Sequence, residues 1–409
     1  MAGIKRRFVS LLLALLATKA SASTLANVLD AHNNTLSVLN NFLAGQQALF
    51  AQLADAKDIT VLAPSNVALN KLQANDAVMD AMASDSGMVE AFLKYHVFQG
   101  VWFTSNFSTS SDSPSIVTTL MNDTAYTNVT GGQRVAGNLV NGAISFQSGN
   151  QNSASVQQGD FNFTGGTIHI IDDVLTIPAN ISDTLINANL TAAQGAFSQS
   201  GLVESINSES EITIFAPSNA GFNAIGAVIA DMSASELASL MGYHVLKGKV
   251  VYTAQMTNQS VTTSEGNEVH IRVEDGGIFV NSARIIKANL FANNGVVHIC
   301  DNVLNPSNEN AQPNPSLSTQ SPAFTGAKTT NSVPFTSGIP TPTPSSSAIA
   351  TATVTAYPVP GGSGGDGGSA PATAGSSSIL FSSSLFARGG IFGLWLLVGW
   401  VQLLAGGLF

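Results

Sequence analysis

Three short motifs occur twice in this chain in the same order, and this internal repeat restricts the fold more than any other feature. The pairs are ITVLAPSN (59–66) with ITIFAPSN (212–219), KYHVFQG (94–100) with GYHVLKG (242–248), and GGTIHIIDDVL (165–175) with NGVVHICDNVL (294–304). Ordered self-similarity indicates two homologous domains of about 130 to 150 residues each. The first repeat is longer between its last two motifs, and we interpret the extra length as loop insertions around residues 108–113 and 149–155.

Each repeat mixes helix and strand patterns. Leu25, Val28 and Leu29 have the spacing of one helix face, whereas residues 59–62 form a short β-branched run that predicts a buried strand. Residues 268–280 alternate apolar and polar side chains on both sides of an Asp-Gly-Gly turn, which predicts a hairpin. Since strands and helices do not alternate regularly, we predict an α+β fold.

Side chains that can cap helices follow the strand motifs. Ser65 or Asn66 is expected to cap a helix, and Ser218 or Asn219 is expected to do the same in the second repeat. Ser233-x-x-Glu236 has the pattern of a capping box ahead of an apolar helix face.

The N-terminal residues have the pattern of a secretory signal peptide, predicted over 1–22. Lys5, Arg6 and Arg7 precede an apolar run at 8–17, and Ala-Ser-Ala at 20–22 offers a cleavage site. The alternative is a membrane anchor, but a run of about ten apolar residues is too short to span a bilayer.

The C-terminal residues have the pattern of a glycosylphosphatidylinositol (GPI) attachment signal, predicted over 379–409. An uncharged apolar run at 391–409 ends the given sequence, and a spacer separates it from a cluster of small residues at 375–378. Ser376 is the candidate attachment residue. A single membrane-spanning tail is the alternative interpretation.

Between the repeats and this tail, residues 306–378 are rich in Ser, Thr, Pro and Gly. They contain few large apolar residues and therefore predict a disordered, O-glycosylated stalk. The predicted organisation is a first domain at 23–178, a second domain at 179–305, and the stalk.

The order of the motifs resembles the fasciclin domain, and the resemblance covers about residues 24–305. It implies a β-sandwich-like wedge with flanking helices, present here as two tandem copies. It also implies an extracellular or surface-anchored protein that mediates cell adhesion or matrix contact. In family members the Tyr-His region is implicated in adhesion, and Tyr95, His96, Tyr243 and His244 match it. Asp-Ile beside the closing motifs and Arg-Gly-Asp are both absent from the sequence, so integrin recognition is not expected.

The histidine and tyrosine residues of the motifs have a second interpretation. His96, His169, His244 and His298 occupy equivalent positions in the two repeats, so they could be metal ligands or packed structural residues. Tyr95 and Tyr243 could likewise be exposed binding residues or buried hydroxyls. In both cases the structural interpretation is favoured, because duplicated core residues produce this pattern.

Enzymatic function is not expected. Matches to G-x-S-x-G and G-x-G-x-x-G both fall in the Gly/Ser stretch at 361–367, without the strand and helix that these motifs require. No metal site and no cofactor is predicted. The single cysteine, Cys300, stands where the first repeat has Ile171, so we interpret it as a core residue, with intermolecular pairing as the alternative.

Glycosylation is expected on a surface of low charge. Only 10% of the residues are charged, and the formal net charge is −10, which argues against nucleic-acid binding. N-linked sequons begin at Asn33, Asn106, Asn122, Asn128, Asn162, Asn180, Asn189 and Asn258.

The sequence therefore predicts an adhesion or wall-contact glycoprotein, held at the cell surface or transferred to a cell wall. Its partners would be other surface or matrix proteins or polysaccharides, and two domains per chain would give multivalent binding. The alternative is a module that binds polysaccharide or a small ligand, with Trp102 and Phe103 as the aromatic candidates for sugar stacking. A hydrolase is a third, weaker interpretation.

Overall fold

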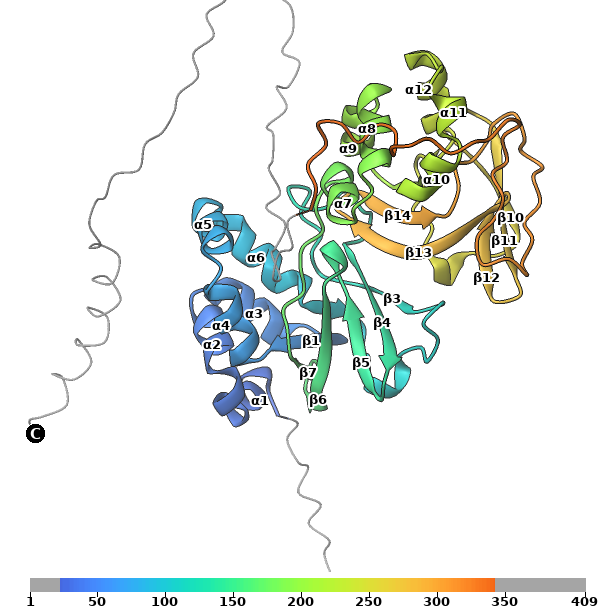
Figure 1. Ribbon diagram of the computed structural model, residues 1–409. Coiled ribbons are helices and arrows are strands. Elements are labelled where there is room, and N and C mark those ends of the chain that lie inside the picture. The colour runs from blue at the N-terminus through green and yellow to red at the C-terminus, as the bar shows by residue number, and fades with distance from the viewer. Residues whose placement is uncertain (1–22, 343–409) are drawn as a thin grey trace, which may run out of the picture. The chain divides into compact units, whose positions relative to one another are not determined.

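The computed structural model describes residues 23–342 (Figure 1). The predicted signal peptide, the GPI signal, Ser376 and the Gly/Ser stretch therefore lie outside the described residues. The two repeats form two domains with the same order of elements. In each domain, three α-helices precede the first strand and three follow it.

The first domain has six α-helices and seven strands. The helices are α1 (Leu25–Ala31), α2 (Asn33–Ala44), α3 (Gln47–Asp55), α4 (Asn66–Gln73), α5 (Asp76–Ser84) and α6 (Ser86–Tyr95). The strands are β1 (Ile59–Pro64), β2 (Val97–Gln99), β3 (Ser115–Thr118), β4 (Arg134–Val140), β5 (Ala143–Gln147), β6 (Ser153–Phe163) and β7 (Gly166–Ile171). Two short 3-10 helices, η1 (Thr104–Asn106) and η2 (Gly149–Gln151), lie in its loops.

The second domain repeats this set with shorter loops. Its helices are α7 (Ile181–Asn187), α8 (Thr191–Gln199), α9 (Val203–Ser208), α10 (Asn219–Ala224), α11 (Gly226–Ile229) and α12 (Ala234–Gly242). Its strands are β8 (Ile212–Pro217), β9 (Val245–Leu246), β10 (Gln259–Thr262), β11 (Glu268–Glu274), β12 (Gly277–Val280), β13 (Ala283–Ala292) and β14 (Gly295–Cys300), and η3 (Thr253–Gln255) corresponds to η1.

Each domain contains one seven-stranded sheet that curls toward closure. The strand order is β2-β1-β7-β6-β5-β4-β3 in the first domain and β9-β8-β14-β13-β12-β11-β10 in the second. The strands of the first and third motifs, β1 with β7 and β8 with β14, pair in parallel, and the other neighbours are antiparallel. The Leu120 N–H donates to the Val97 carbonyl (2.8 Å) beside a Phe98–Thr119 bridge, which joins the two ends of the first sheet. The helices cover one end of each sheet (Figure 1).

The A-P-S-N motif builds the first turn of the helix that follows it. The Ser65 hydroxyl accepts the Ala68 N–H (3.3 Å), and the Ser218 hydroxyl accepts the Gly221 N–H (3.0 Å). The Asn66 side chain accepts the Val38 N–H (2.9 Å) and so ties α4 to α2. Since a serine oxygen satisfies an N–H that the helix leaves unpaired, these contacts confirm the predicted caps. The capping box at Ser233 and Glu236 and the hairpin between β11 and β12 are also confirmed.

A close backbone approach explains the glycine in the closing motif. Gly166 pairs with Ile59, and Gly295 pairs with Ile212. A Cβ atom at Gly166 would lie 1.7 Å from the Ile59 carbonyl oxygen, and one at Gly295 would lie 1.9 Å from the Ile212 carbonyl oxygen. These distances are far below van der Waals contact, so both positions require glycine.

The expectation of a disordered stalk from residue 306 differs from the structure over residues 306–342. Gln320 is only 5% exposed, and its N–H donates to the Asp301 carboxylate (2.7 Å). Phe335 packs edge-on against Phe222 of α10, with ring centroids 5.9 Å apart. Composition predicts the average behaviour of a segment, whereas a few well-placed side chains order this one against the second domain. The remainder of the predicted stalk lies outside the described residues.

The α+β class and the two tandem domains with flanking helices are confirmed. One apolar core fills the first domain, and the second has a cluster under its helices and another inside its sheet. Every helix and strand that carries a motif residue contributes to these cores.

Candidate functional site

The Tyr95–His96 pair lies in the core where α6 ends and β2 begins. Both side chains are buried. The Tyr95 hydroxyl donates to the Arg134 carbonyl of β4 (3.1 Å). His96 Nδ1 donates to the Phe92 carbonyl (2.8 Å), and its Nε2 accepts the Leu175 N–H (2.8 Å). Because both partners are backbone groups of fixed polarity, they select one neutral form of the ring.

The Tyr243–His244 pair repeats this arrangement in the second domain. His244 bonds the Leu240 carbonyl (2.8 Å) and the Leu304 N–H (2.9 Å). The Tyr243 hydroxyl donates to the Glu268 carbonyl (2.8 Å) and accepts from the Asn281 amide (2.9 Å). Burial lowers the pKa of both His96 and His244 to about 4. These rings are therefore neutral at pH 7.

The histidines of the closing strands also bond backbone groups. His169 Nε2 donates to the Trp102 carbonyl (2.7 Å), and His298 Nε2 donates to the Val251 carbonyl (2.8 Å). Burial lowers the pKa of His298 to about 4 and also lowers that of His169. Each ring ties its closing strand to the segment that follows the Tyr-His motif. The Nδ1 atoms of these two rings accept the Asp160 N–H (3.1 Å) and the Asn289 N–H (3.4 Å). Since every ring nitrogen of the four histidines has a backbone partner, the geometry supports their structural interpretation.

Trp102 differs from the four Tyr-His residues because its side chain is partly exposed. Its ring stacks on Phe107, with centroids 5.4 Å apart, and its indole N–H donates to the Gln99 carbonyl (3.0 Å). The neighbouring Val101 and Phe103 are each 37% exposed. The five predicted binding residues thus separate into four core residues and one surface aromatic beside two exposed apolar side chains.

Tyr243→Phe is expected to lower the free energy of unfolding by about 2 kcal/mol, because the Glu268 carbonyl and the Asn281 amide would lose a buried partner. Tyr95→Phe, which removes one bond, should cost about half as much. Tyr252→Phe is the matched control, since the buried Tyr252 hydroxyl has no hydrogen-bond partner among the described residues. Chemical denaturation measures the free energy of unfolding of all three variants. Equal losses in the Tyr243 and Tyr252 variants would contradict a stabilising role for the hydrogen bonds of the Tyr243 hydroxyl.

Cys300 is fully buried in β14, and burial raises the pKa of its thiol. It packs in the sheet cluster of the second domain. This position supports the interpretation as a core residue.

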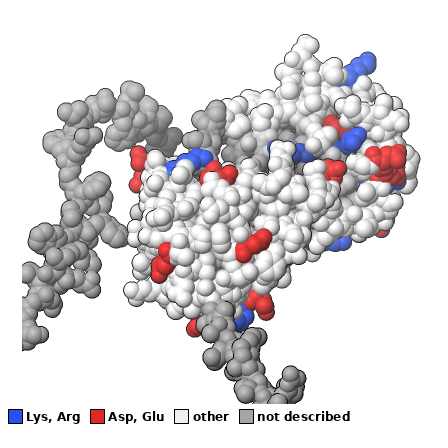
Figure 2. Space-filling model, turned by 90° about the horizontal axis from the view of Figure 1, so that it is seen from below, with Lys and Arg blue, Asp and Glu red and all other residues white. Residues whose placement is uncertain are grey.

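The sequon asparagines within the structure are accessible to different degrees. Asn33, Asn106, Asn122, Asn162, Asn189 and Asn258 are exposed, whereas Asn128 and Asn180 are half-buried. Asn180 caps α7, and its amide group donates to the Asp183 carboxylate (3.0 Å). Figure 2 shows that charged side chains are scattered over the face drawn, most of which is uncharged. A surface of this kind leaves solubility to neutral polar groups and to any attached sugar.

A loop that sequence reasoning missed joins the two domains. The Thr119 N–H donates to the Gln133 carbonyl (2.9 Å), as the Thr263 N–H does to the Asn267 carbonyl (2.8 Å) in the second domain. The first domain therefore has residues 120–132 where the second has only 264–266. We call residues 120–132 the docking loop. Lining up the β3–β4 and β10–β11 hairpins would have exposed this insertion in the sequence.

The docking loop and its flanks bind the turn between β13 and β14. The Asn128 N–H (2.7 Å) and the Thr127 hydroxyl (3.0 Å) donate to the Asn293 carbonyl. The Gln133 side chain donates to the Ala292 carbonyl (3.0 Å).

An apolar cluster accompanies these bonds. Tyr252, Phe291 and Val296 of the second domain pack with Ala136 of the first, and Ile116 and Val250 lie at its margin. We call Tyr252, Phe291 and Val296 the docking face. Phe291 is only 1% exposed, which shows that the first domain covers this face well.

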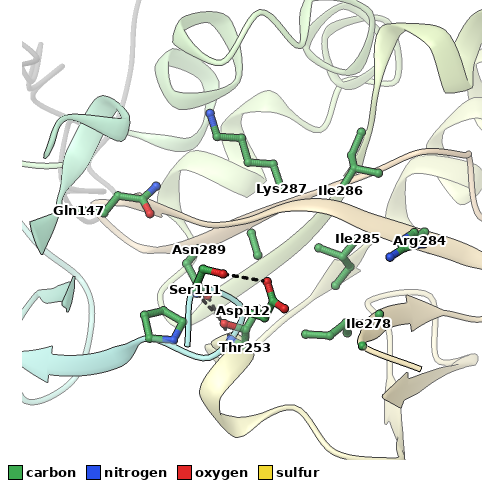
Figure 3. A pocket seen from close by; sticks show the side chains of 14 residues that line it. Ser111, Asp112, Gln147, Thr253, Ile278, Arg284, Ile285, Ile286, Lys287 and Asn289 are labelled. Carbon is green, nitrogen blue, oxygen red and sulfur yellow. Dashed lines mark hydrogen bonds between the residues drawn. The ribbon is translucent and has the colours of Figure 1, made fainter. Parts of the chain in front are cut away.

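A groove of about 480 Å³ opens beside this interface. The residues that line it come from both domains, and Figure 3 labels Ser111, Asp112 and Gln147 of the first and Thr253, Arg284 and Lys287 of the second. Lys287 also contacts the Gln151 side chain. Asp112 is the one carboxylate among the described residues that line the groove, so these residues hold no pair of carboxylates for acid–base chemistry.

Two absences hold for residues 23–342 alone. In that range no group of three or more His, Cys, Asp or Glu side chains is placed to hold a metal ion. None of the helices in that range has the length and apolarity that crossing a bilayer requires.

Two α+β domains, each with a curled seven-stranded sheet braced by a buried Tyr-His pair, define the class of this protein. The sequence model of the Fasciclin domain matches residues 20–178 and 188–306. A fasciclin-like arabinogalactan protein of Arthroderma benhamiae is 35% identical over 311 residues, which cover 75% of this chain and 72% of that protein. The chain belongs to the fasciclin domain family.

More distant proteins are similar over parts of the chain. Human periostin is 32% identical over 163 residues, which are 38% of this chain and 19% of periostin. The solved structure of a FAS1 domain pair from the insect cell adhesion molecule fasciclin I is 17% identical with a TM-score of 0.34, and the match covers 68% of this chain and 99% of that structure.

Proposed function

We propose that this chain is a secreted glycoprotein that is held at the cell surface and contacts the surrounding matrix or wall through its two fasciclin domains. The observation that carries the proposal is that fasciclin domains fill both repeats. The sequence patterns for secretion and for a GPI anchor support the location. The similarity to a fasciclin-like arabinogalactan protein supports a role at a glycan-rich surface.

The proposed mechanism is multivalent contact. Each chain would present two domains, and many anchored chains would act together, so weak individual contacts would add up to firm attachment. Partners would be surface or matrix proteins or polysaccharides. The proposal includes no enzymatic step, no cofactor and no nucleic acid.

Phosphatidylinositol-specific phospholipase is expected to release the protein from intact cells, because a GPI anchor would be its only link to the membrane. The measurement is the amount of protein in the medium before and after treatment. Retention on the cells would contradict the GPI proposal, and detergent extraction would then separate a spanning tail from covalent transfer to a wall.

Loss of the gene should reduce attachment of cells to one another or to a substrate. The wild-type gene restored in the deletion strain is the control. Unchanged attachment, when surface display has been confirmed in the parent strain, would contradict the adhesion role.

Polysaccharide binding by Trp102 and Phe103 is the second candidate, and the partial exposure of both side chains favours it. A glycan array probed with the secreted protein would test it, and Phe103→Ser should weaken any signal. Absence of binding at high protein concentration would contradict this candidate.

A further inference from the structure

The docking face of the second domain has a counterpart on the first. In β13, Phe291 pairs with Val296, and Gly295 begins the closing strand. In β6, Asn162 pairs with Thr167 one residue after the equivalent Gly166. The register therefore places Asn162 where the second domain has the interface residue Phe291.

Phe103 is the counterpart of Tyr252 by the same reasoning. The Phe103 N–H donates to the side-chain oxygen of Asn106 (2.8 Å), and the Tyr252 N–H donates to the side-chain oxygen of Gln255 (3.3 Å). Each aromatic residue also comes directly after the residue whose carbonyl accepts a hydrogen bond from the closing-strand histidine, which is Trp102 in the first domain and Val251 in the second. Tyr252 is 3% exposed in the interface, whereas Phe103 is 37% exposed.

The register places Asn162 beside two exposed apolar side chains, Val101 and Phe103, which we call the free face. It is an apolar surface at the end of the domain pair, and no described residue covers it as the first domain covers the docking face. Exposed apolar surface at a position that is an interface in the sister domain requires a cover or invites association.

Two sequons flank the free face. Asn106 belongs to η1, directly after Phe103, and Asn162 lies in β6. The Thr104 N–H (2.9 Å) and the Thr104 hydroxyl (2.6 Å) both donate to the Asp160 carboxylate, which fixes η1 beside β6. The Asn106 Oδ1 atom accepts the Phe103 N–H, so the amide nitrogen that would carry a sugar is the other atom of the group.

A second copy of the chain cannot cover the free face in the way that the first domain covers the docking face. The docking loop that accepts such a face is already occupied by the chain's own second domain. The second domain offers no equivalent, because its corresponding loop is only 264–266. Ser260 and His270 stand at the register positions of Ile116 and Ala136, and their side chains bond each other (2.7 Å).

We propose that N-linked glycans on Asn106 and Asn162 cover the free face. The inference rests on the proposed role as a secreted glycoprotein and identifies the two glycans that form a cap over the free face. The bulk and hydration of these glycans shield Val101 and Phe103 and prevent association through them.

The experiment uses the full chain, expressed in a eukaryotic host that adds N-linked glycans and purified as the mature protein. Asn106→Gln with Asn162→Gln removes both sugars from the free face. Ser108→Ala with Thr164→Ala removes the same sequons and keeps the asparagine side chains. Asn33→Gln with Asn189→Gln removes two sugars from exposed sites among the helices and is the matched control.

Both test variants are expected to bind a dye for apolar surface at least about twofold more strongly than the wild type, and to sediment as larger species. The control variant should behave as the wild type. Adding Phe103→Ser to the first test variant should return dye binding and sedimentation to wild-type values, while circular dichroism shows that the fold is retained.

Mass spectrometry of the wild type separates the two ways of failing. Sugars at other sequons but at neither Asn106 nor Asn162 would overturn the cap and leave the proposed function intact. A secreted protein without any N-linked sugar would overturn the cap and the proposed glycoprotein together. Unchanged dye binding and sedimentation in both test variants would also overturn the cap.

Discussion

Replacing Gly295 with alanine is expected to unfold the second domain. The new Cβ atom would lie 1.9 Å from the Ile212 carbonyl oxygen, which belongs to the backbone of β8 and cannot rotate away. Strands β8 and β14 would have to separate at the start of their parallel ladder, which runs from Gly295 to Cys300. We expect a loss of at least about 3 kcal/mol in the free energy of unfolding, at the upper end of what overpacking costs.

Hydrogen exchange followed along the chain measures this effect domain by domain. Protection should fall in β8, β13 and β14 and persist in the first domain. Gly166→Ala should have the mirror effect, because its Cβ would lie 1.7 Å from the Ile59 carbonyl oxygen. Gly45→Ala is the control, since its Cβ would meet nothing closer than 3.4 Å and its φ is −74°. Equal stability of the Gly295 and Gly45 variants would contradict the argument.

The motifs could predict local structure because each carries a local physical signal. The sequence narrowed each helix cap to two neighbouring residues, and the structure selects Ser65 and Ser218. The turn after β11 needs only its Asp-Gly pair. The parallel pairing of β1 with β7 joins strands far apart in the chain, and no local signal specifies it. The duplicated Tyr-His pairs indicated core residues, and the structure explains why: each ring or hydroxyl bonds backbone groups across the domain.

The surfaces of the molecule were harder to predict than its core. The docking loop is polar and carries two sequons, so its composition resembles that of an ordinary insertion. Its role depends on the carbonyls of Ala292 and Asn293, which every sequence has and no pattern distinguishes. Residues 306–342 have the composition of a stalk, yet Gln320 and Phe335 fit particular sites on the second domain.

Acidification is expected to destabilise both domains well above the pH at which most carboxylates titrate. His96, His244 and His298 are neutral and fully buried, and burial lowers their pKa from an ordinary value of 6.5 to about 4. Each ring has one nitrogen that donates to a carbonyl and another that accepts a backbone N–H, so a second ring proton would face an N–H group. Protonation therefore requires the ring to leave the core.

The direction of the effect follows from proton binding. Between pH 6.5 and about 4 the unfolded chain binds more protons at these histidines than the folded chain, so stability falls as the pH falls through this range. Each unit of pKa difference corresponds to about 1.4 kcal/mol. Between about pH 7 and about pH 5, His244 and His298 together should cost the second domain roughly 4 kcal/mol, and His96 should cost the first domain about half as much. Asp183 and Asp301 act in the opposite direction, since burial raises the pKa of both carboxyl groups, and they offset part of this loss.

Urea denaturation at a series of pH values tests this origin when it is repeated on His244→Asn. The variant should be less stable than the wild type at pH 7, because the bonds to Leu240 and Leu304 are impaired. The further loss of its second domain between pH 7 and pH 5 should nevertheless be smaller by about half, because one of the two titrating rings in that domain is gone. His270→Asn is the control, since it removes a histidine that lies half-exposed in β11 rather than in the core. An unaltered pH dependence in the His244 variant would show that groups other than the buried histidines control acid unfolding.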